Sequence, residues 1–400
     1  MGMKLGIFGV VCLLMTGWLA GLAHGQPAAA PSVKVLINPG DHGEQSRSSV
    51  YVGWKSVTEQ ALRKDKMGAT VMLSHDATAD LGSTRSRIHD IFVAPAHVIG
   101  SAVRYGYTPV LALERPVQAV LVAPKDSAIH NLNEAAGKRL GLPLQDSVVT
   151  YLLRGEVNAA NTTIKRHFGA LYETRYQEAL LPCLQLRRCD LVAVERSVFE
   201  RWVAAGESLK VVLESRAVPG LSLAVRDDVR PGAAALKSSV TEALANAAAP
   251  RAESAKLASL TKEDFDYVST LGYFTPRALA GATLVDAPAV AQLLQRGVSF
   301  VDTRTDAEFK AAHVPGAKLV PYVEKSAKDA DYDAKLDQFD LSKLPPDRGA
   351  ELIFACNGAE CWKSFKASHV ALQAGYKKVY WFRGGLPEWR SAGYKVETAN

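Results

Sequence analysis

The sequence predicts an α/β protein with two domains. Short runs of Val, Ile and Leu, which favour buried strands, alternate with segments whose apolar residues recur every three or four positions, as in helices that cover a sheet. The chain has 400 residues, enough for two or three domains. A helical tail and linker at 251–282, broken at Pro276, interrupts the alternation and separates a domain at 33–250 from one at 283–397.

In the first domain, the alternation argues for parallel sheets with helices on their faces. Strands are predicted for the short apolar runs at residues 33–38, 70–74, 90–94, 110–113, 119–122, 138–142, 190–194, 209–213 and 221–225. Helices are predicted where the apolar spacing is helical, at 50–62, 98–104, 132–136, 147–153, 176–184 and 233–248. The domain is long enough to form two lobes.

The composition narrows the classes of partner. A hydrophobic content of 48% and a charged content of 22% are ordinary for a soluble globular chain. The net charge of +6 includes no run of Lys and Arg and no aromatic-basic alternation, so we expect small anionic ligands and no nucleic acid. No spacing of Cys and His fits a zinc site and no Gly-rich nucleotide fingerprint is present, so we expect neither a metal nor a cofactor.

The N-terminus has the pattern of a secretory signal peptide. Lys4 precedes a mostly apolar run at 5–22, and small residues before Gly25 suit cleavage there. We therefore expect a signal peptide at 1–25, a flexible entry segment at 26–32, and export to a periplasm, with the membrane contacted only through the signal peptide. The alternative is an uncleaved membrane anchor.

Three short blocks, at 92–97, 137–147 and 189–195, resemble the phosphate/phosphonate group of periplasmic substrate-binding proteins of ABC transporters. The resemblance implies two lobes with a ligand in the cleft between them and closure by a hinge motion. It also implies crossings between the lobes near 113–119 and 214–219, a small oxyanion or phosphonate-like ligand, and an ABC permease as a possible partner.

Three residues are the main candidates for ligand contact in this cleft. Ser147 should begin a helix, where a hydroxyl and unpaired backbone N–H groups bind anions, although it may simply be the cap of that helix. His97 follows a strand and is expected to donate to an oxyanion or to respond to pH, unless it is structural. Glu195 ends a strand and is expected to accept a proton or bind an amine, unless it pairs with an Arg. His75 and Arg85 are weaker candidates in loops near the cleft.

The second domain contains a cysteine in a reactive setting. Cys356 follows the apolar run at 352–355, and a short polar loop leads from it into a helix that opens at Trp362. Backbone N–H groups at such a position favour the thiolate, and Lys363 adds positive charge. We therefore expect Cys356 to be an ionised nucleophile that attacks sulfane sulfur and holds it as a persulfide. The alternative is a buried structural cysteine.

Blocks at 300–304, 308–317, 374–380 and 383–389 surround this cysteine, and together they resemble a rhodanese (sulfurtransferase) domain. The resemblance implies a parallel α/β fold and transfer of sulfane sulfur, for example from thiosulfate, to a thiol or cyanide acceptor through Cys356. The backbone amides between Asn357 and Trp362 would hold the anion. Two alternatives remain open: a binding or sensing protein whose rhodanese domain is not catalytic, and a phosphatase.

The resemblance also assigns roles around Cys356. Lys363 and Ser364 match the basic residue and hydroxyl that close the family's loop, but Lys lacks the bidentate fork of Arg, and the loop is a residue or two longer. Trp362 is either a lid or a packing residue. Asp302 and Arg304 are expected to form an ion pair beside the site. The expected active-site loop comprises Asn357, Gly358, Ala359, Glu360, Cys361, Trp362, Lys363 and Ser364.

The cysteines leave two questions open. Cys12 lies in the signal peptide, which leaves an even number in the mature chain. Cys183 and Cys189 form either a disulfide or two independent buried thiols. Cys356 and Cys361 are close enough in sequence to pair reversibly, which would make Cys361 a resolving thiol.

Overall fold

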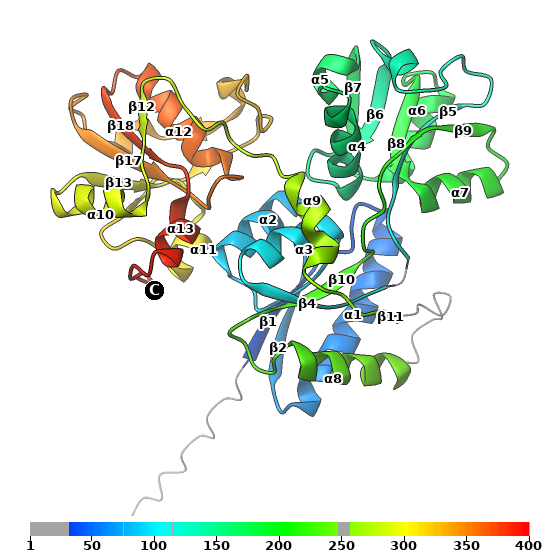
Figure 1. Ribbon diagram of the computed structural model, residues 1–400, viewed down its shortest axis with the longest axis horizontal. Coiled ribbons are helices and arrows are strands. Elements are labelled where there is room, and N and C mark those ends of the chain that lie inside the picture. Colours follow the sequence, from blue (N-terminus) through cyan, green and yellow to red (C-terminus); the bar gives the residue numbers. More distant parts are fainter. Residues whose placement is uncertain (1–31, 75, 114, 247–256, 400) are drawn as a thin grey trace, which may run out of the picture.

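The computed structural model describes residues 32–74, 76–113, 115–246 and 257–399. In Figure 1 the first lobe lies at the bottom, the second lobe at the upper right, and the C-terminal domain at the upper left. The predicted signal peptide at 1–25 lies outside the described residues, as does the entry segment at 26–32 apart from its last residue. No helix in the described ranges combines the length and the apolar character needed to cross a bilayer.

The first lobe is a six-stranded mixed sheet in the order β11-β4-β10-β3-β1-β2. Its strands are β1 (Ser32–Ile37), β2 (Gly68–Leu73), β3 (Ile91–Ala94), β4 (Tyr107–Leu113), β10 (Ser222–Arg226) and β11 (Leu257–Ala258). Its helices are α1 (Glu44–Lys64), α2 (Ala77–Ser86), α3 (Ala96–Arg104) and α8 (Ala233–Asn246). Helices α1 and α8 cover one face through residues such as Trp54 and Leu236, and α3 covers the other.

The second lobe is a five-stranded mixed sheet in the order β7-β6-β8-β5-β9. Its strands are β5 (Ala119–Pro124), β6 (Arg139–Pro143), β7 (Ala170–Thr174), β8 (Leu191–Glu195) and β9 (Leu209–Glu214). Its helices are η1 (Asn133–Ala135), α4 (Val148–Ala159), α5 (Ile164–His167), η2 (Gln177–Ala179), α6 (Leu180–Gln185) and α7 (Arg196–Ala204). Cys183 and Cys189 form a disulfide in this lobe, with Cα atoms 5.3 Å apart, which decides between the two alternatives for this pair.

The chain crosses between the lobes from β4 to β5 and from β9 to β10, the two positions that the sequence predicts. Val117 and Val218 pair as an isolated antiparallel bridge at these crossings. The prediction of parallel sheets is wrong for both lobes. The reason is that β5 and β10, the strands that follow the two crossings, each run antiparallel to both of their neighbours.

Two elements of the lobes lack the patterns on which sequence prediction depends. Helix α2 buries mostly polar side chains, among them Asp80, Thr84 and Arg85, so it shows no apolar stripe. Strand β7 is an edge strand whose residues are largely exposed, so it shows neither an apolar run nor alternation.

The C-terminal domain contains a five-stranded sheet, in the order β12-β18-β17-β13-β14, that is parallel throughout, as predicted. Its strands are β12 (Ala282–Leu284), β13 (Ser299–Asp302), β14 (Lys318–Leu319), β17 (Glu351–Ala355) and β18 (Lys378–Phe382), with a hairpin of β15 (Tyr322–Val323) and β16 (Gln338–Phe339). Its helices are α10 (Ala287–Gln295), α11 (Asp306–Ala311), η4 (Ala334–Leu336), η5 (Leu341–Lys343), α12 (Trp362–Gln373) and α13 (Gly385–Ser391). Apolar clusters fill both faces of the sheet.

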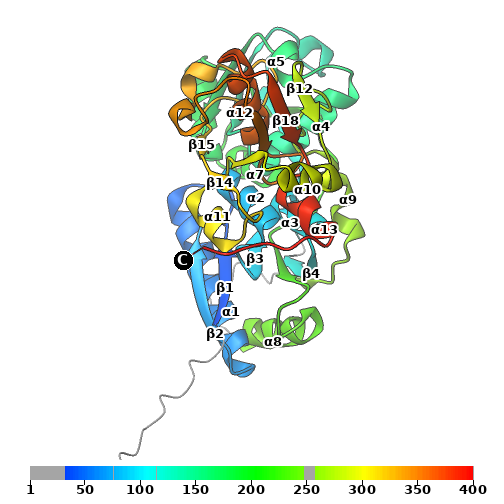
Figure 2. The same cartoon turned by 90° about the vertical axis from the view of Figure 1, so that its left-hand side faces the viewer.

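The segment between the domains is more integrated than a tail. Strand β11 completes the sheet of the first lobe, and η3 (Glu263–Phe265) and α9 (Asp266–Thr270) pack on α3 through Phe265 and Val268. In the C-terminal domain, α11 and α13 lie against α2 of the first lobe (Figure 1, Figure 2). The two domains therefore share an interface beside the loop that follows β17.

Candidate functional site

The loop of residues 356–361, called the Cys356 loop below, begins at the centre of the C-terminal sheet. Cys356 directly follows β17, which lies between β18 and β13, and α12 begins at Trp362. Gly385 lies against the loop with φ of +55°, and a Cβ atom there would be 2.1 Å from the Cys356 carbonyl oxygen. Only glycine permits this approach, which brings the N–H of Leu386 to within 3.1 Å of the same carbonyl.

The Cys356 thiol is buried and faces the domain interior. Its side chain is 1% exposed, and its Sγ atom donates to the Cys361 carbonyl oxygen at 3.1 Å and lies 3.0 Å from Ser364 Oγ. Ser364 Oγ accepts a hydrogen bond from Trp381 Nε1 at 3.1 Å, so the serine proton is available to the sulfur. Burial, together with the neighbouring Cys361, raises the pKa of Cys356 well above its ordinary value. The expectation of an open, ionised Cys356 is therefore wrong for this arrangement, because the thiol is desolvated.

Cys361, the last residue of the loop, carries the second free thiol. Cys361 caps the N-terminus of α12 and is also buried. Burial alone would raise its pKa, but the contact with the Cys356 thiol, the charges of Arg85 and Lys363, and the backbone N–H of Asn357 lower the pKa of Cys361 to about 7. The Cys361 thiol is therefore expected to ionise more readily than that of Cys356.

The linker covers the outer side of the Cys356 loop. The Ala359 carbonyl accepts hydrogen bonds from the Thr275 N–H at 2.8 Å and from the Thr275 hydroxyl at 2.9 Å. Trp362 Nε1 donates to the Tyr273 carbonyl at 2.8 Å, and Glu360 lies directly against Gly272. Trp362 is 4% exposed, which favours the packing role over that of a lid.

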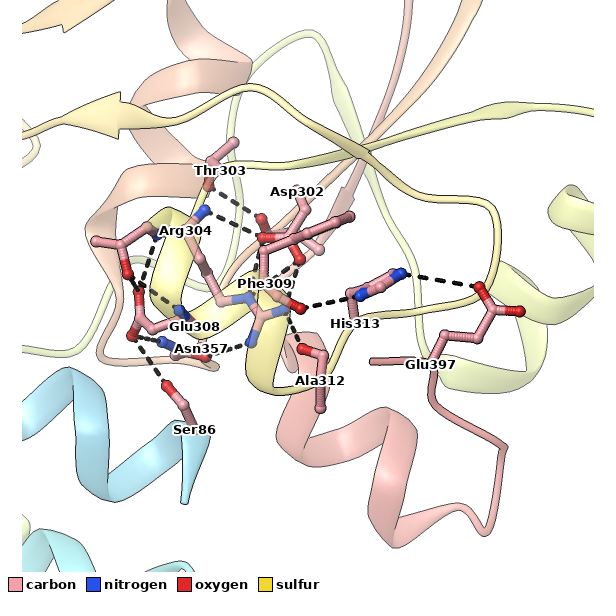
Figure 3. A network of polar contacts seen from close by, with 12 residues as sticks. Ser86, Asp302, Thr303, Arg304, Glu308, Phe309, Ala312, His313, Asn357 and Glu397 are labelled. Atoms are coloured by element: carbon pink, nitrogen blue, oxygen red, sulfur yellow. Dashed lines mark hydrogen bonds and ion pairs between the residues drawn. The ribbon is translucent and has the colours of Figure 1, made fainter. Parts of the chain in front are cut away.

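A buried polar network supports the start of the loop (Figure 3). Arg304 and Asp302 form the predicted ion pair, with Nη2 and Oδ2 2.6 Å apart and both side chains almost fully buried. Asn357 lies 3.4 Å from Arg304 Nη1 through its Oδ1 atom and donates to Glu308 Oε1 at 2.5 Å. Glu308 also accepts a hydrogen bond from Ser86 of α2 at 2.9 Å, so the network reaches the first lobe.

The other loop and turn residues have structural positions. Gly358 has φ of +87°, and a Cβ atom there would lie 3.4 Å from the Tyr105 hydroxyl of the first lobe. Lys363 is half-buried, and its charge lowers the pKa of Glu308 although burial of that carboxyl acts in the opposite direction. His313 lies 2.9 Å from the Phe309 carbonyl through Nδ1, away from the loop, as expected for a structural histidine.

A cavity of about 1070 Å³ lies between the lobes. Both lobes line it, as the sequence predicts for a binding cleft. The C-terminal domain also lines it, through the segment 324–330 and Trp362, and the linker does so through Tyr273 and Phe274. The cleft therefore has a third wall that the sequence did not predict.

Basic side chains from all three parts line the cleft. They are Arg47, Arg154, Lys165, Arg175, Lys325 and Lys328. The guanidinium of Arg154 lies 3.6 Å from the centre of the Tyr273 ring, and its buried Nε atom has no hydrogen-bond partner among the described residues. Arginines stacked on aromatic rings and turned into a cavity are suited to bind planar or tetrahedral anions.

Asp146 joins three parts of the chain at one end of the cleft. Its carboxylate accepts hydrogen bonds from Lys328 Nζ of the C-terminal domain at 2.6 Å and from Thr78 of the first lobe. The Lys328 and Asp146 side chains are 8% and 10% exposed. Burial would raise the pKa of Asp146, but Lys328 and Thr78 lower it, so the ion pair is charged at neutral pH.

Two of the predicted cleft residues line the cavity. Ser147 caps α4 by accepting from the Val149 N–H at 3.1 Å and donates across the cleft to Asp41 at 2.5 Å, so the capping alternative holds. His97 Nε2 lies 2.8 Å from the Asp146 carbonyl, and its Nδ1 has no hydrogen-bond partner among the described residues. Burial lowers the pKa of His97 to about 4, so the neutral ring presents an acceptor rather than the donor that was expected.

Glu195 is not among the residues that line the cavity, contrary to the expectation from its position at a strand end. Its carboxylate lies 3.2 Å from Gln177 Nε2 and 3.5 Å from His42 Nε2 of the first lobe. Burial lowers the pKa of His42, but Glu178, Glu195 and Asp41 together raise it to about 9. Glu195 therefore pairs with a protonated histidine across the two lobes. The alternative partner expected from the sequence was an Arg.

Several candidate site residues were not identified from the sequence. Arg154 and Lys328 carry no local signal, because only the fold brings them to the cleft. Arg85 was placed near the cleft but lies at the interface with the Cys356 loop, and His75 lies outside the described residues. Within the part of the chain that the structure describes, no group of three or more His, Cys, Asp or Glu side chains is arranged to hold a metal ion.

Comparisons with known families match both domains. The profile of the rhodanese-like domain matches residues 286–392. The profile of the ABC-transporter phosphonate periplasmic substrate-binding protein matches residues 84–271.

Two curated proteins resemble the C-terminal domain. An HTH-type transcriptional regulator of Mycobacterium tuberculosis is 33% identical over 116 residues, which are 28% of this chain and 45% of that protein. Thiosulfate sulfurtransferase 18 of Arabidopsis thaliana is 30% identical over 120 residues, which are 28% of this chain and 82% of that protein. The chain thus spans less than half the length of the first relative and most of the second.

Solved structures resemble the two-lobed part. A binding protein component of an ABC phosphonate transporter from Pseudomonas aeruginosa is 16% identical, with a TM-score of 0.48, and the match covers 60% of this chain and 85% of that one. PhnD1 from Prochlorococcus marinus, in complex with methylphosphonate, is 13% identical, with a TM-score of 0.47, and the match covers 60% and 96% of the two chains.

Proposed function

The chain belongs to the rhodanese-like family through its C-terminal domain, and we propose that this domain transfers sulfane sulfur through Cys356. The observation that carries the proposal is the pair of thiols at the end of the central strand. Cys356 lies against Ser364 Oγ at 3.0 Å, and Cys361 has a pKa of about 7 in spite of its burial. A thiol beside a thiolate can be activated without a separate general base.

In the proposed cycle, Cys361 accepts the proton of Cys356, and the Cys356 sulfur attacks the outer sulfur of thiosulfate. The S–S bond of thiosulfate breaks, sulfite leaves with the bonding electron pair, and Cys356 keeps the sulfur as a persulfide anion. A thiol or cyanide then attacks the terminal sulfur. With cyanide, thiocyanate forms and the thiolate of Cys356 returns, so atoms and charge balance in both steps.

The experiment is a thiosulfate:cyanide assay on the chain that begins after residue 25. Thiocyanate should form with the wild type and fall to background with Cys356→Ser. The matched control is the double variant Cys183→Ser, Cys189→Ser, which removes two other sulfur atoms and should keep its activity. Equal activity of the wild type and Cys356→Ser, or no transfer with any sulfane donor, contradicts the proposal.

We also propose that the two-lobed domain binds a small oxyanion or phosphonate-like ligand in the cleft. The match to the phosphonate-binding profile supports this, and so do the basic side chains of the cleft, which line it together with acidic ones such as Asp76 and Glu173. Arg154, which stacks on Tyr273 and has an unpartnered Nε atom, is the residue most suited to hold the anion. A thermal-shift screen of phosphate, sulfate, thiosulfate and methylphosphonate should raise Tm by mass action, and Arg154→Met should abolish the shift. No shift with any of these anions contradicts this assignment.

The same family match supports export to a periplasm and a possible ABC permease partner. Cell fractionation tests the export: the mature chain should appear in the periplasmic fraction with an N-terminus near residue 26. Recovery of the uncleaved chain in the membrane fraction would favour the anchor instead.

A second candidate function is that of a substrate-binding or sensor protein whose rhodanese-like domain is not catalytic. The burial of Cys356 and the linker over its loop favour this candidate. It predicts anion-induced shifts in Tm together with no sulfur transfer from any donor, which is the outcome that separates it from the first proposal.

A further inference from the structure

The C-terminal end of α2 in the first lobe lies at the Cys356 loop. The Ser86 hydroxyl donates to Glu308 at 2.9 Å, and Glu308 accepts the hydrogen bond from the loop residue Asn357 (Figure 3). The Ser86 carbonyl accepts from Arg390 of α13 at 3.3 Å. These contacts fix the position of the last turn of α2 relative to the loop.

Arg85 precedes Ser86 on this turn and is a buried cation without a hydrogen-bonded partner. Its side chain is buried, with the whole residue 6% exposed, and its Nε atom has no hydrogen-bond partner among the described residues. Burial disfavours its charge, but the negative charges of Cys361 and Glu360 act most strongly in its favour, and the net effect raises the pKa of Arg85. A buried guanidinium is stable only where negative charge is available to it.

We propose that the two-lobed domain completes the sulfur-transfer site, with Arg85 of α2 placing a buried, unpartnered positive charge beside the Cys356 loop. This inference rests on the proposed sulfur transfer. Arg85 acts through Cys361 as a positioning residue: it keeps the thiolate that accepts the Cys356 proton when the donor is attacked. The active site is then assembled only when the two domains are docked.

Other ionisable groups lie around the Cys356 loop. Lys363, on the first turn of α12, contributes positive charge from the C-terminal domain itself. Glu360, whose Oε2 atom lies 3.6 Å from Arg104 of α3, competes for Arg85. The Tyr105 hydroxyl lies near Gly358, and burial raises its pKa to about 12, so it is neutral and can donate. Arg85 is thus a buried cation that the first lobe supplies and that has no hydrogen-bond partner among the described residues.

The test is the pH dependence of Cys361 alkylation in the full mature chain. The background variant is Cys356→Ser, which keeps a hydroxyl donor and leaves Cys361 as the only thiol, since Cys183 and Cys189 are joined. Intact-mass measurement of the rate with iodoacetamide should give a midpoint near pH 7. Arg85→Gln should raise that midpoint by about one pH unit, so that alkylation at pH 6 slows about tenfold.

Arg87→Gln is the matched control. Arg87 lies two residues further along the chain and pairs with Asp228 of the first lobe at 3.1 Å. Its midpoint should match that of the background variant, and Arg85→Lys should restore most of the effect of Arg85. An unchanged midpoint in Arg85→Gln, or an equal change in Arg87→Gln, overturns the inference.

Two further measurements cover a failure to fold and separate this inference from the proposed function. Should Arg85→Gln lose its far-UV circular dichroism, Glu360→Gln decides instead: removal of the competing carboxylate should lower the midpoint, and a rise overturns the inference. A midpoint that depends on Arg85 in a chain without sulfur transfer leaves the charge assignment in place and contradicts the proposed function. Sulfur transfer in a chain whose alkylation midpoint is independent of Arg85 supports the proposed function and overturns the inference about Arg85.

Discussion

Replacement of Lys328 by Met tests whether the docked arrangement of the domains controls access to the thiols. Lys328 and Asp146 form an ion pair with 2.6 Å between Nζ and Oδ1, and their side chains are 8% and 10% exposed. Removal of one partner leaves the other as a buried, unpaired charge, which costs about 3 kcal/mol. Because the pair joins the C-terminal domain to the second lobe, its loss destabilises the docked arrangement of the domains. A change of about 3 kcal/mol corresponds to about a 100-fold change in the docking equilibrium.

The assay is alkylation of the Cys356–Cys361 pair at pH 8 under non-denaturing conditions. Both thiols are buried, so the reagent reacts only with an opened state of the protein. The alkylation rate therefore reports the population of that state. Lys328→Met should therefore react about 100-fold faster than the wild type. Lys325→Met is the control, because Lys325 lines the same cleft with an exposed side chain and removes the same charge.

A rate for Lys328→Met within about twofold of that for Lys325→Met refutes the reasoning, since the ion pair would then have no role in docking. The double variant Lys328→Met, Asp146→Asn gives an internal check. It leaves no unpaired charge, so its rate should fall back toward the wild-type value. Additive effects of the two substitutions would mean that the side chains do not interact.

Three other predictions follow from single contacts. The pKa of His42 is raised from 6.5 to about 9, so its charge stabilises the contact between the lobes fully below pH 6.5 and less and less between pH 6.5 and 9. Tm should therefore fall over that range in the wild type and not in His42→Gln. Gly385→Ala places a Cβ atom 2.1 Å from a loop carbonyl and should lower both Tm and sulfur transfer, whereas Gly393→Ala, at φ of +79° with no atom within 4 Å, should only lower Tm slightly. Ser364→Ala removes the hydroxyl beside the reactive sulfur and should slow sulfur transfer about tenfold. Ser368→Ala, on the same helix, removes a hydroxyl without a hydrogen-bond partner among the described residues and should leave the rate unchanged.

The parts of the site that sequence predicts are those encoded by neighbouring residues. The apolar run of β17, the loop glycine and the helix that begins at Trp362 together place Cys356 at a strand end, because strand, turn and helix each have a local pattern. The ion pair of Asp302 and Arg304 is also local, since the two residues are separated by only one position. The cap at Ser147 follows from its side chain and the helix after it.

The parts that sequence does not predict depend on how the domains dock. The sequence predicts an ionised Cys356, but its burial raises the pKa of that thiol, and Arg85, which affects the pKa of Cys361, is 271 positions away from Cys356 in the chain. Lys328 lies in an irregular segment with no pattern of its own. Glu195 ends a strand as predicted, but its carboxylate pairs with His42 of the facing lobe. The position at a strand end alone does not show which side chain reaches a cleft.

The cleft and the thiol pair are joined by one helix. Trp362, next to Cys361, lines the cleft and donates to the Tyr273 carbonyl, and one turn later the fully buried Lys366 holds the segment 324–330 through Glu324 at 2.7 Å. Since α12 begins at the Cys356 loop, an anion that binds only when these walls are in place also favours the docked arrangement in which the end of α2 lies against that loop. Coupling of this kind is reciprocal: an anion that favours the thiolate must bind more tightly when the thiolate is present. The proposed anion binding and the proposed sulfur transfer would then depend on one equilibrium, between docked and undocked arrangements of the two domains.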